Sequence, residues 1–145
     1  MSVLRTRSGI STMWVFVMLN MIFADILSAM DASILKQYLA GTADQITITP
    51  TFILIAAIAT EIPIAMVVAS RLLPTGINRW ANIVVAIYTV IYIWGGMVAM
   101  PHYIFFAAMQ TIALASIAWA AWGMREPEAR ADTVLATGPT SVPAH

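Results

Sequence analysis

Four long apolar segments, separated by short connections, constrain the fold of this chain more than any other feature. Each is about 20 residues long, which at 1.5 Å per helical residue is enough to cross the ~30 Å hydrocarbon layer of a bilayer. Backbone amides find no water in lipid, and the segments lack the polar and apolar alternation of a membrane barrel. The sequence therefore predicts an all-α membrane protein, a four-transmembrane-helix bundle with spans at residues 12–30, 51–73, 80–100 and 103–122.

The composition excludes several classes of protein. With 61% hydrophobic and 10% charged residues and a mean hydropathy of +0.85, a water-soluble domain is not expected. The zero net charge gives no indication of nucleic-acid binding, and the absence of cysteine excludes thiolate metal sites and cysteine nucleophiles. The two histidines, His102 and His145, lie outside the spans. No metal site and no cofactor are therefore predicted.

The positive charges predict the orientation of the spans. Six of the seven cationic side chains fall on one side of the predicted membrane, and only Lys36 falls on the other; the six are Arg5, Arg7, Arg71, Arg79, Arg125 and Arg130. This bias places both termini in the cytoplasm and the chain in the cytoplasmic (inner) membrane of the cell. Trp14, Trp80, Trp119 and Trp122 fall near the same boundary, where aromatic anchors are common.

The segments that flank the spans define the domain organisation. The bundle is expected over residues 12–124, after a cytoplasmic N-terminal segment at 1–11. Residues 125–145 are rich in Ala, Pro, Thr and acidic residues, which predicts a disordered cytoplasmic tail. A cleavable signal peptide is the alternative for the first span, but this apolar run is too long for a signal core and is interrupted by polar residues.

The connections carry recognisable start and stop signals. Residues 32–40 predict a short interfacial helix ended by Gly41, with an ordered loop as the alternative. Thr49 and Pro50 form a good helix start, with a hydroxyl cap followed by proline at the first position. Pro74, Gly76 and Asn78 predict a tight break between the second and third spans, and Pro101 predicts another before the fourth.

Glu61 is the deepest carboxyl group in the predicted spans, about 16 Å from the start of its helix. A charge at this depth costs roughly 2.5 to 3.5 kcal/mol on insertion scales, so such groups normally face a protein interior. Ala57 and Ala65 lie four residues on either side, which predicts that this face meets a neighbouring helix. Pro63 is expected to kink the helix and to leave the Ala59 carbonyl without a donor.

Other polar residues in the spans complete a candidate intramembrane site. Asp25 lies about 9 Å from the outer end of the first span, and Asn20 points in a different direction, about 140° away at 100° per residue. A water or a proton could link Asp25 to Glu61. The remaining candidates are Asn82, Thr89 and Gln110, which lie on stripes of small residues in the third and fourth spans. Helix packing and one interhelical hydrogen bond are the alternative explanation of these residues.

Three runs resemble a known family: LNMIFADILSAMD at residues 19–31, EIPIAMVVASR at 61–71 and NRWANI at 78–83. They are similar to a family of short bacterial four-span proteins catalogued only as a domain of unknown function. The resemblance covers residues 13–122 and implies the fold and the membrane location, with no catalytic residues to carry over. In size and topology such proteins are loosely similar to DoxX-like four-span proteins, some of which assist redox enzymes.

Three functional hypotheses follow. The first is a polar bundle interior around Glu61 that binds a small molecule, an ion or a proton. The second is an accessory subunit that packs through its small-residue stripes against other membrane subunits or against itself. The third, less expected, is a lipid- or quinone-linked membrane enzyme in which Glu61 or Asp25 acts as acid or base.

Overall fold

The computed structural model describes residues 3–43, 46–96 and 99–124, and it is built almost entirely of helices. The elements in chain order are α1 (Val3–Ala29), α2 (Ala32–Leu39), β1 (Thr42–Ala43), β2 (Ile46–Thr47), α3 (Pro50–Leu72), α4 (Thr75–Gly95) and α5 (Pro101–Trp122). The helices α1, α3, α4 and α5 are long and apolar enough to cross a membrane, and they pack together. The predicted fold of four packed apolar helices is confirmed. The length and composition of these helices are those of a multi-pass membrane protein.

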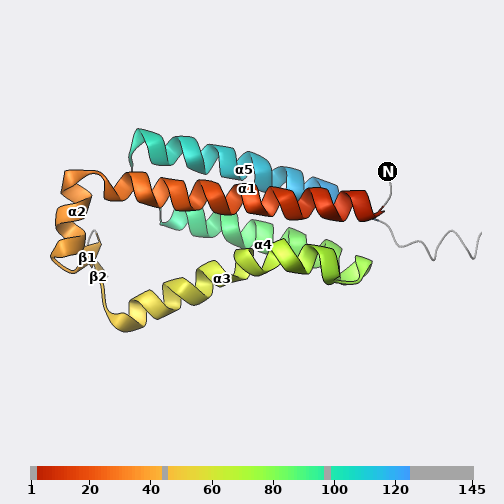
Figure 1. The fold of residues 1–145 in the computed structure, drawn as a ribbon, viewed down its shortest axis with the longest axis horizontal. Coiled ribbons are helices and arrows are strands. Elements are labelled where there is room, and N and C mark those ends of the chain that lie inside the picture. The colour runs from red at the N-terminus through yellow and green to blue at the C-terminus, as the bar shows by residue number, and fades with distance from the viewer. Residues whose placement is uncertain (1–2, 44–45, 97–98, 125–145) are drawn as a thin grey trace, which may run out of the picture.

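The four long helices form a ring in which each packs on two neighbours. Helix α1 contacts α3 and α5, and α4 contacts the same two helices from the other side. Figure 1 shows α2 and the two short strands at one end of this bundle, with the start of α1, the α3–α4 connection and the end of α5 at the other end. The beginning of α1 and the end of α5 therefore lie at the same end of the bundle, as an even number of spans requires.

The core is unevenly distributed among the helices. Fully buried apolar side chains come mostly from α1, α4 and α5, among them Trp14, Val17, Ala86, Leu114 and Ile117. Helix α3 buries only Pro63, Met66 and Ser70, all in its second half. None of the residues of its first half, 50–62, is buried. Figure 1 shows this half slanting away from the other helices, so the buried side chains of α3 lie towards one end of the bundle.

All four long helices begin earlier than the predicted spans, and the difference is largest for α1 and α4. Helix α1 starts at Val3, nine residues before the predicted span, and this extension buries Ile10 and Ser11. The prediction that Gly76 and Asn78 break the chain is wrong, because α4 already starts at Thr75. Asn78 is buried inside α4, and its Nδ2 donates to the Ser70 carbonyl of α3 at 2.6 Å, which ties the two helices together across the turn.

The first connection is more ordered than a simple loop. The short helix predicted here is confirmed as α2, and Gly41 follows it with a φ of 75°, a left-handed conformation that glycine adopts without steric cost. The strands β1 and β2, which were not predicted, pair antiparallel directly after it. The Thr49 hydroxyl then accepts a hydrogen bond from the Phe52 N–H at 3.1 Å, which confirms the predicted cap of α3.

Candidate functional site

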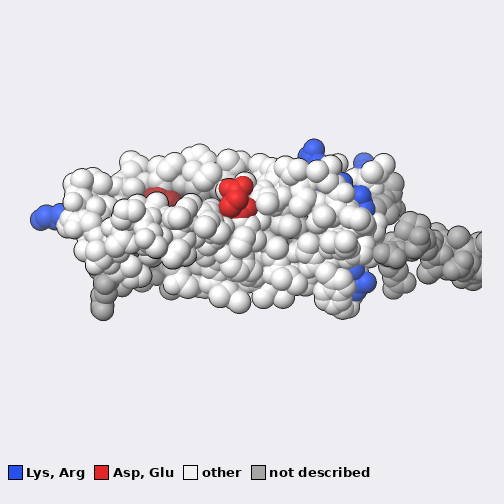
Figure 2. Space-filling view, turned by 90° about the horizontal axis from the view of Figure 1, so that it is seen from below, with Lys and Arg blue, Asp and Glu red and all other residues white. Residues whose placement is uncertain are grey.

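Glu61 faces away from the helix bundle. The side chains that α3 buries, Met66 and Ser70 among them, lie about 140° to 180° around the helix from Glu61 at 100° per residue. Glu61 is exposed, and so are Ala57 and Ala65 on either side of it. The prediction that this small-residue face meets another helix of the same chain is therefore wrong. Figure 2 shows acidic side chains on a flank that is otherwise free of charged side chains, between cations at its two ends.

A cavity of about 920 Å³ lies between the first half of α3 and the helices α1, α4 and α5. Its wall is mostly apolar and includes the side chains of Phe52, Ile55 and Ile91. The polar residues that line it come from five different helices: Asp25, Tyr38, Thr60, Tyr92, Tyr103 and Gln110. This combination of an apolar wall with a few polar groups is typical of a small-molecule site.

The cavity exists because α3 is held away from α4 in this region. The Tyr88 hydroxyl donates to the Ala59 carbonyl at 3.0 Å, and the hydroxyl oxygens of Tyr92 and Thr60 are 3.2 Å apart. The two tyrosine rings stack on each other with their centroids 6.2 Å apart. Two large side chains of α4 thus fill the gap to α3 with hydrogen bonds at their tips, and the space beside them stays open.

Some polar groups of the cavity have a hydrogen-bond partner in the protein and others have none. The Tyr103 hydroxyl donates to the Ile93 carbonyl at 3.3 Å. Gln110 is 2% exposed, and its Oε1 is buried without a hydrogen-bond partner. The Asp25 carboxyl group also faces the cavity, and none of the described residues that line it is Lys, Arg or His. The cavity therefore presents hydrogen-bond acceptors and a carboxyl group, with no basic side chain opposite them.

The remaining predicted site residues lie elsewhere. Asn82 belongs to a separate buried network, in which its Oδ1 accepts from Trp14 Nε1 at 2.7 Å and its Nδ2 donates to the Asn78 carbonyl at 2.8 Å. The Thr89 hydroxyl donates to the Val85 carbonyl of its own helix at 2.7 Å. These groups are satisfied within the protein, so they stabilise the packing and leave nothing for a ligand. The structure brings together only two of the six predicted residues, Asp25 and Gln110.

Asn20 and Trp14 on α1 also differ from their predicted roles. The Asn20 amide donates to the Phe16 carbonyl one turn earlier at 2.8 Å, and the side chain does not reach the cavity. Trp14 is completely buried, so the prediction that it anchors the chain in the headgroup layer is wrong. The reason is that its indole N–H has an acceptor inside the bundle, in Asn82.

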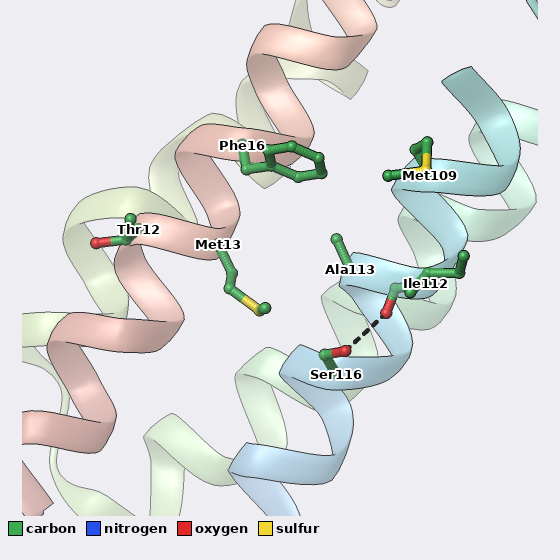
Figure 3. A pocket seen from close by; sticks show the side chains of 7 residues that line it. All are labelled: Thr12, Met13, Phe16, Met109, Ile112, Ala113 and Ser116. Atoms are coloured by element: carbon green, nitrogen blue, oxygen red, sulfur yellow. Dashed lines mark hydrogen bonds between the residues drawn. The ribbon is translucent and has the colours of Figure 1, made fainter. Parts of the chain in front are cut away.

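A second, smaller pocket of about 320 Å³ lies between α1 and α5. Figure 3 shows Met13 and Phe16 of α1 projecting towards Met109 and Ala113 of α5, and the Ser116 hydroxyl bonded to the Ile112 carbonyl of its own helix. The Thr12 hydroxyl likewise donates to the carbonyl of Ser8. The wall of this pocket is apolar, and the hydroxyl groups of Thr12 and Ser116 already bond within their own helices. The pocket therefore offers no free polar group that would orient a polar ligand.

Arginine side chains gather at the end of the bundle opposite α2. Arg71 Nε donates to the Ser11 hydroxyl at 2.8 Å, and an Arg7 terminal nitrogen donates to the Thr75 hydroxyl at 3.0 Å. The Arg79 guanidinium lies over the Trp122 ring, 4.5 Å from its centroid. These contacts link α1, α3, α4 and α5 at one end, as the prediction from charge required. Arg125, Arg130 and the predicted tail lie outside the described residues.

The described residues provide no metal centre. Within the described ranges, no three His, Cys, Asp or Glu side chains lie close enough together to hold a metal ion. The sequence of the bundle is nevertheless recognisable: the profile of a family of unknown function, DUF6326, matches residues 4–128. The chain belongs to this family. No curated protein and no solved structure matches it significantly.

The DUF6326 match includes all four long helices and the cavity between them. It confirms the resemblance to a domain of unknown function, whereas the looser similarity to DoxX-like proteins stays a prediction. The family description gives no activity, so the function has to be argued from the cavity. Sequence reasoning missed Tyr92, which lines this site, and Tyr88, which stands one turn before it within an apolar span.

Proposed function

We propose that this membrane protein binds a small amphipathic molecule with a basic, hydrogen-bond-donating head group in the cavity beside Asp25. The observation that carries the proposal is the Gln110 Oε1, which lies buried and unpartnered in a residue that lines the cavity. A buried acceptor without a donor costs about 1 to 3 kcal/mol. A ligand that donates an N–H to Gln110 would remove that cost and gain affinity from it.

The charge of the cavity favours an amine. The Asp25 carboxyl group is an acceptor, and no basic residue lines the cavity within the described part of the chain. An ammonium group would pair with this carboxylate, and the faces of Tyr38, Tyr92 or Tyr103 would add a cation–π contribution. The apolar wall would hold the body of the ligand, since burial of apolar surface contributes about 25 cal/mol per Å².

The position of the cavity favours a ligand that arrives through the lipid. The first half of α3 forms one wall, and none of its residues is buried. Amphipathic molecules concentrate in the bilayer, and the gap beside α3 opens towards it. The sequence predicted the small-molecule site around Glu61, and the proposed site lies beside Asp25 instead. The enzyme hypothesis has no support beyond the carboxyl group of Asp25 itself.

The test uses three fluorescent probes with one apolar body: pyrenemethylamine, pyrenemethanol and pyrenecarboxylic acid. Each is titrated against the full chain in lipid nanodiscs, and binding is followed by fluorescence anisotropy, with empty nanodiscs as the background. We expect the amine to bind most tightly and the carboxylate least. Asp25→Asn should weaken the amine at least tenfold and leave the alcohol nearly unchanged, because only the amine uses the charge.

Gln110→Leu and Ser116→Ala form the control pair. Gln110→Leu removes the unpartnered acceptor and should weaken both donor-bearing probes several-fold. Ser116 lies in the other pocket and bonds within its own helix, so Ser116→Ala should change nothing. Equal affinity of the wild-type chain for the three probes, or an unchanged affinity in both cavity variants, would contradict the proposal.

A further inference from the structure

Helix α3 carries a continuous uncovered face with a carboxyl group at its centre. Glu61 lies eleven residues from each end of the helix, hence midway across the predicted span. The exposed residues that share its side follow at spacings of three and four: Leu54, Ala57, Ile58, Ile64, Ala65, Val68 and Leu72. Only 11% of the α3 span is buried, against 28% to 39% of the other three spans. This helix is the least covered of the four.

An acyl chain is a poor neighbour for Glu61. Charged side chains at this depth are costly in lipid, and intramembrane carboxyl groups are almost always found facing protein, water or a polar partner. Within the described part of the chain, no side chain of the same copy bonds to Glu61, and Arg7, Arg71 and Arg79 make their contacts at one end of the bundle. A polypeptide packed on this face would supply a polar partner for the carboxyl group.

We infer that this partner is a second copy of the chain, paired through α3 so that Glu61 meets Glu61. Two copies inserted in the same orientation are related by a two-fold axis along the membrane normal, and this axis brings residues of equal depth together. The one polar group that a second copy offers at the depth of Glu61 on this face is its own Glu61. Two carboxyl groups are complementary when one of them is protonated, since its O–H donates to an oxygen of the other.

The residues around Glu61 fit a close helix crossing. Ala57 and Ala65 stand one turn below and above it, so the backbones can approach at the crossing point. The larger exposed side chains Leu54, Val68 and Leu72 lie further out, where two crossing helices diverge. A partner of different sequence would need its own donor at this depth, and this alternative is an outcome of the test. The inference is independent of the proposed ligand, because Glu61 and the cavity lie on different sides of α3.

The absence of cysteine from the chain allows a direct test of the pairing. Single-cysteine variants of the full chain in native membranes are treated with copper phenanthroline, and disulfide-linked dimers are counted on gels. Ala57→Cys and Ala65→Cys are the test positions. Ala115→Cys is the matched control, because Ala115 is an exposed alanine on α5. We expect dimers to form at least tenfold faster at the two α3 positions than at the control.

The role of the carboxyl group is tested by energy transfer between labelled copies diluted in vesicles of phosphatidylcholine. Glu61→Gln keeps a self-complementary group and should pair within about twofold of wild type. Glu61→Leu removes the hydrogen bonds and should weaken pairing roughly fivefold to tenfold, which lies within the range measured for interhelical hydrogen bonds. Ala57→Leu should weaken it by blocking the close approach, and Ala115→Leu should not.

The outcomes are decisive in both directions. Faster crosslinking on α3 together with the loss in Glu61→Leu and retention in Glu61→Gln supports the inference. A wild-type chain that remains monomeric at high protein-to-lipid ratio overturns it and points to a partner of different sequence. Pairing that is unchanged in Glu61→Leu and Ala57→Leu also overturns it, because the copies then meet through another face.

Discussion

The Tyr88 hydroxyl donates a hydrogen bond of 3.0 Å to the Ala59 carbonyl, the group that Pro63 leaves without a helical donor. A proline inside a transmembrane helix is tolerated when a neighbouring side chain satisfies the freed carbonyl. Here the donor comes from α4, and the same contact keeps the first half of α3 at a distance. The tyrosine therefore repairs the backbone, and Tyr92, one turn later on the same helix, lines the cavity.

Tyr88→Phe is expected to destabilise the bundle by about 1 kcal/mol, because the Ala59 carbonyl loses its donor. In a Pro63→Ala background the residue at 63 regains its N–H, so the same substitution should cost clearly less. The measurement is equilibrium unfolding by SDS in mixed micelles, followed by far-UV circular dichroism, for the four members of the cycle. Tyr92→Phe is the control, because Thr60 keeps its bond to the Ala56 carbonyl. If the free-energy costs of Tyr88→Phe and Pro63→Ala simply add in the double variant, Tyr88 does not act on the carbonyl that Pro63 frees.

The Trp14–Asn82 hydrogen bond crosses the bundle from α1 to α4 and is a second point of vulnerability. Asn82→Leu leaves the buried indole N–H without an acceptor and should cost about 1 to 3 kcal/mol of stability. Adding Trp14→Phe removes the orphaned donor and should recover part of that loss. The same unfolding measurement applies. Asn20→Leu, at a partly exposed site bonded only within α1, should change stability by no more than about 0.5 kcal/mol.

The sequence predicted the architecture because lipid leaves few options. Apolar segments of the right length have to be helices, and the cap at Thr49 was readable from a single residue. Boundaries were less predictable: α4 continues through Gly76 because Asn78 finds a buried acceptor in α3. That contact depends on tertiary structure, which local helix-breaking signals do not include.

The candidate site was predicted only in part, for a physical reason. A small-residue stripe packs equally well within one chain or between two, and the stripe at Ala57 and Ala65 gave no way to distinguish them. Glu61 was therefore placed inside the bundle and lies outside it. Asp25 and Gln110 were found because polar groups in apolar spans are informative by themselves. The tyrosines were not predicted as site residues, because aromatic rings in an apolar span are usually explained by helix packing.

The arginine cluster gives a prediction about topology. Arg7, Arg71 and Arg79 make their contacts at the end of the bundle opposite α2, and the positive-inside rule places that end in the cytoplasm. In intact cells, Thr47→Cys on β2 should react with a membrane-impermeant maleimide. Pro74→Cys in the α3–α4 turn should react only after the membrane is permeabilised. The reverse labelling pattern would place both termini outside.

The N-cap of α2 predicts a pH dependence. The Ser33 hydroxyl and the N–H groups of Ser33 and Ile34 donate to the Asp31 carboxylate, and these hydrogen bonds hold the pKa of Asp31 below its ordinary value. Because the folded pKa is depressed, the cap stabilises α2 fully above the unfolded pKa of about 3.9 and loses that effect as the pH falls through the folded pKa.

Amide hydrogen exchange of α2 measures this effect directly. Protection of the α2 amides should stay constant from neutral pH down to about 4 and then fall as Asp31 takes up its proton. Asp31→Asn keeps a capping oxygen that does not titrate, so it should abolish the acid transition while leaving the helix protected at neutral pH. Ser33→Ala removes the strongest of the hydrogen bonds to the carboxylate and should move the transition to higher pH. If the transition persists in Asp31→Asn, a group other than Asp31 is titrating.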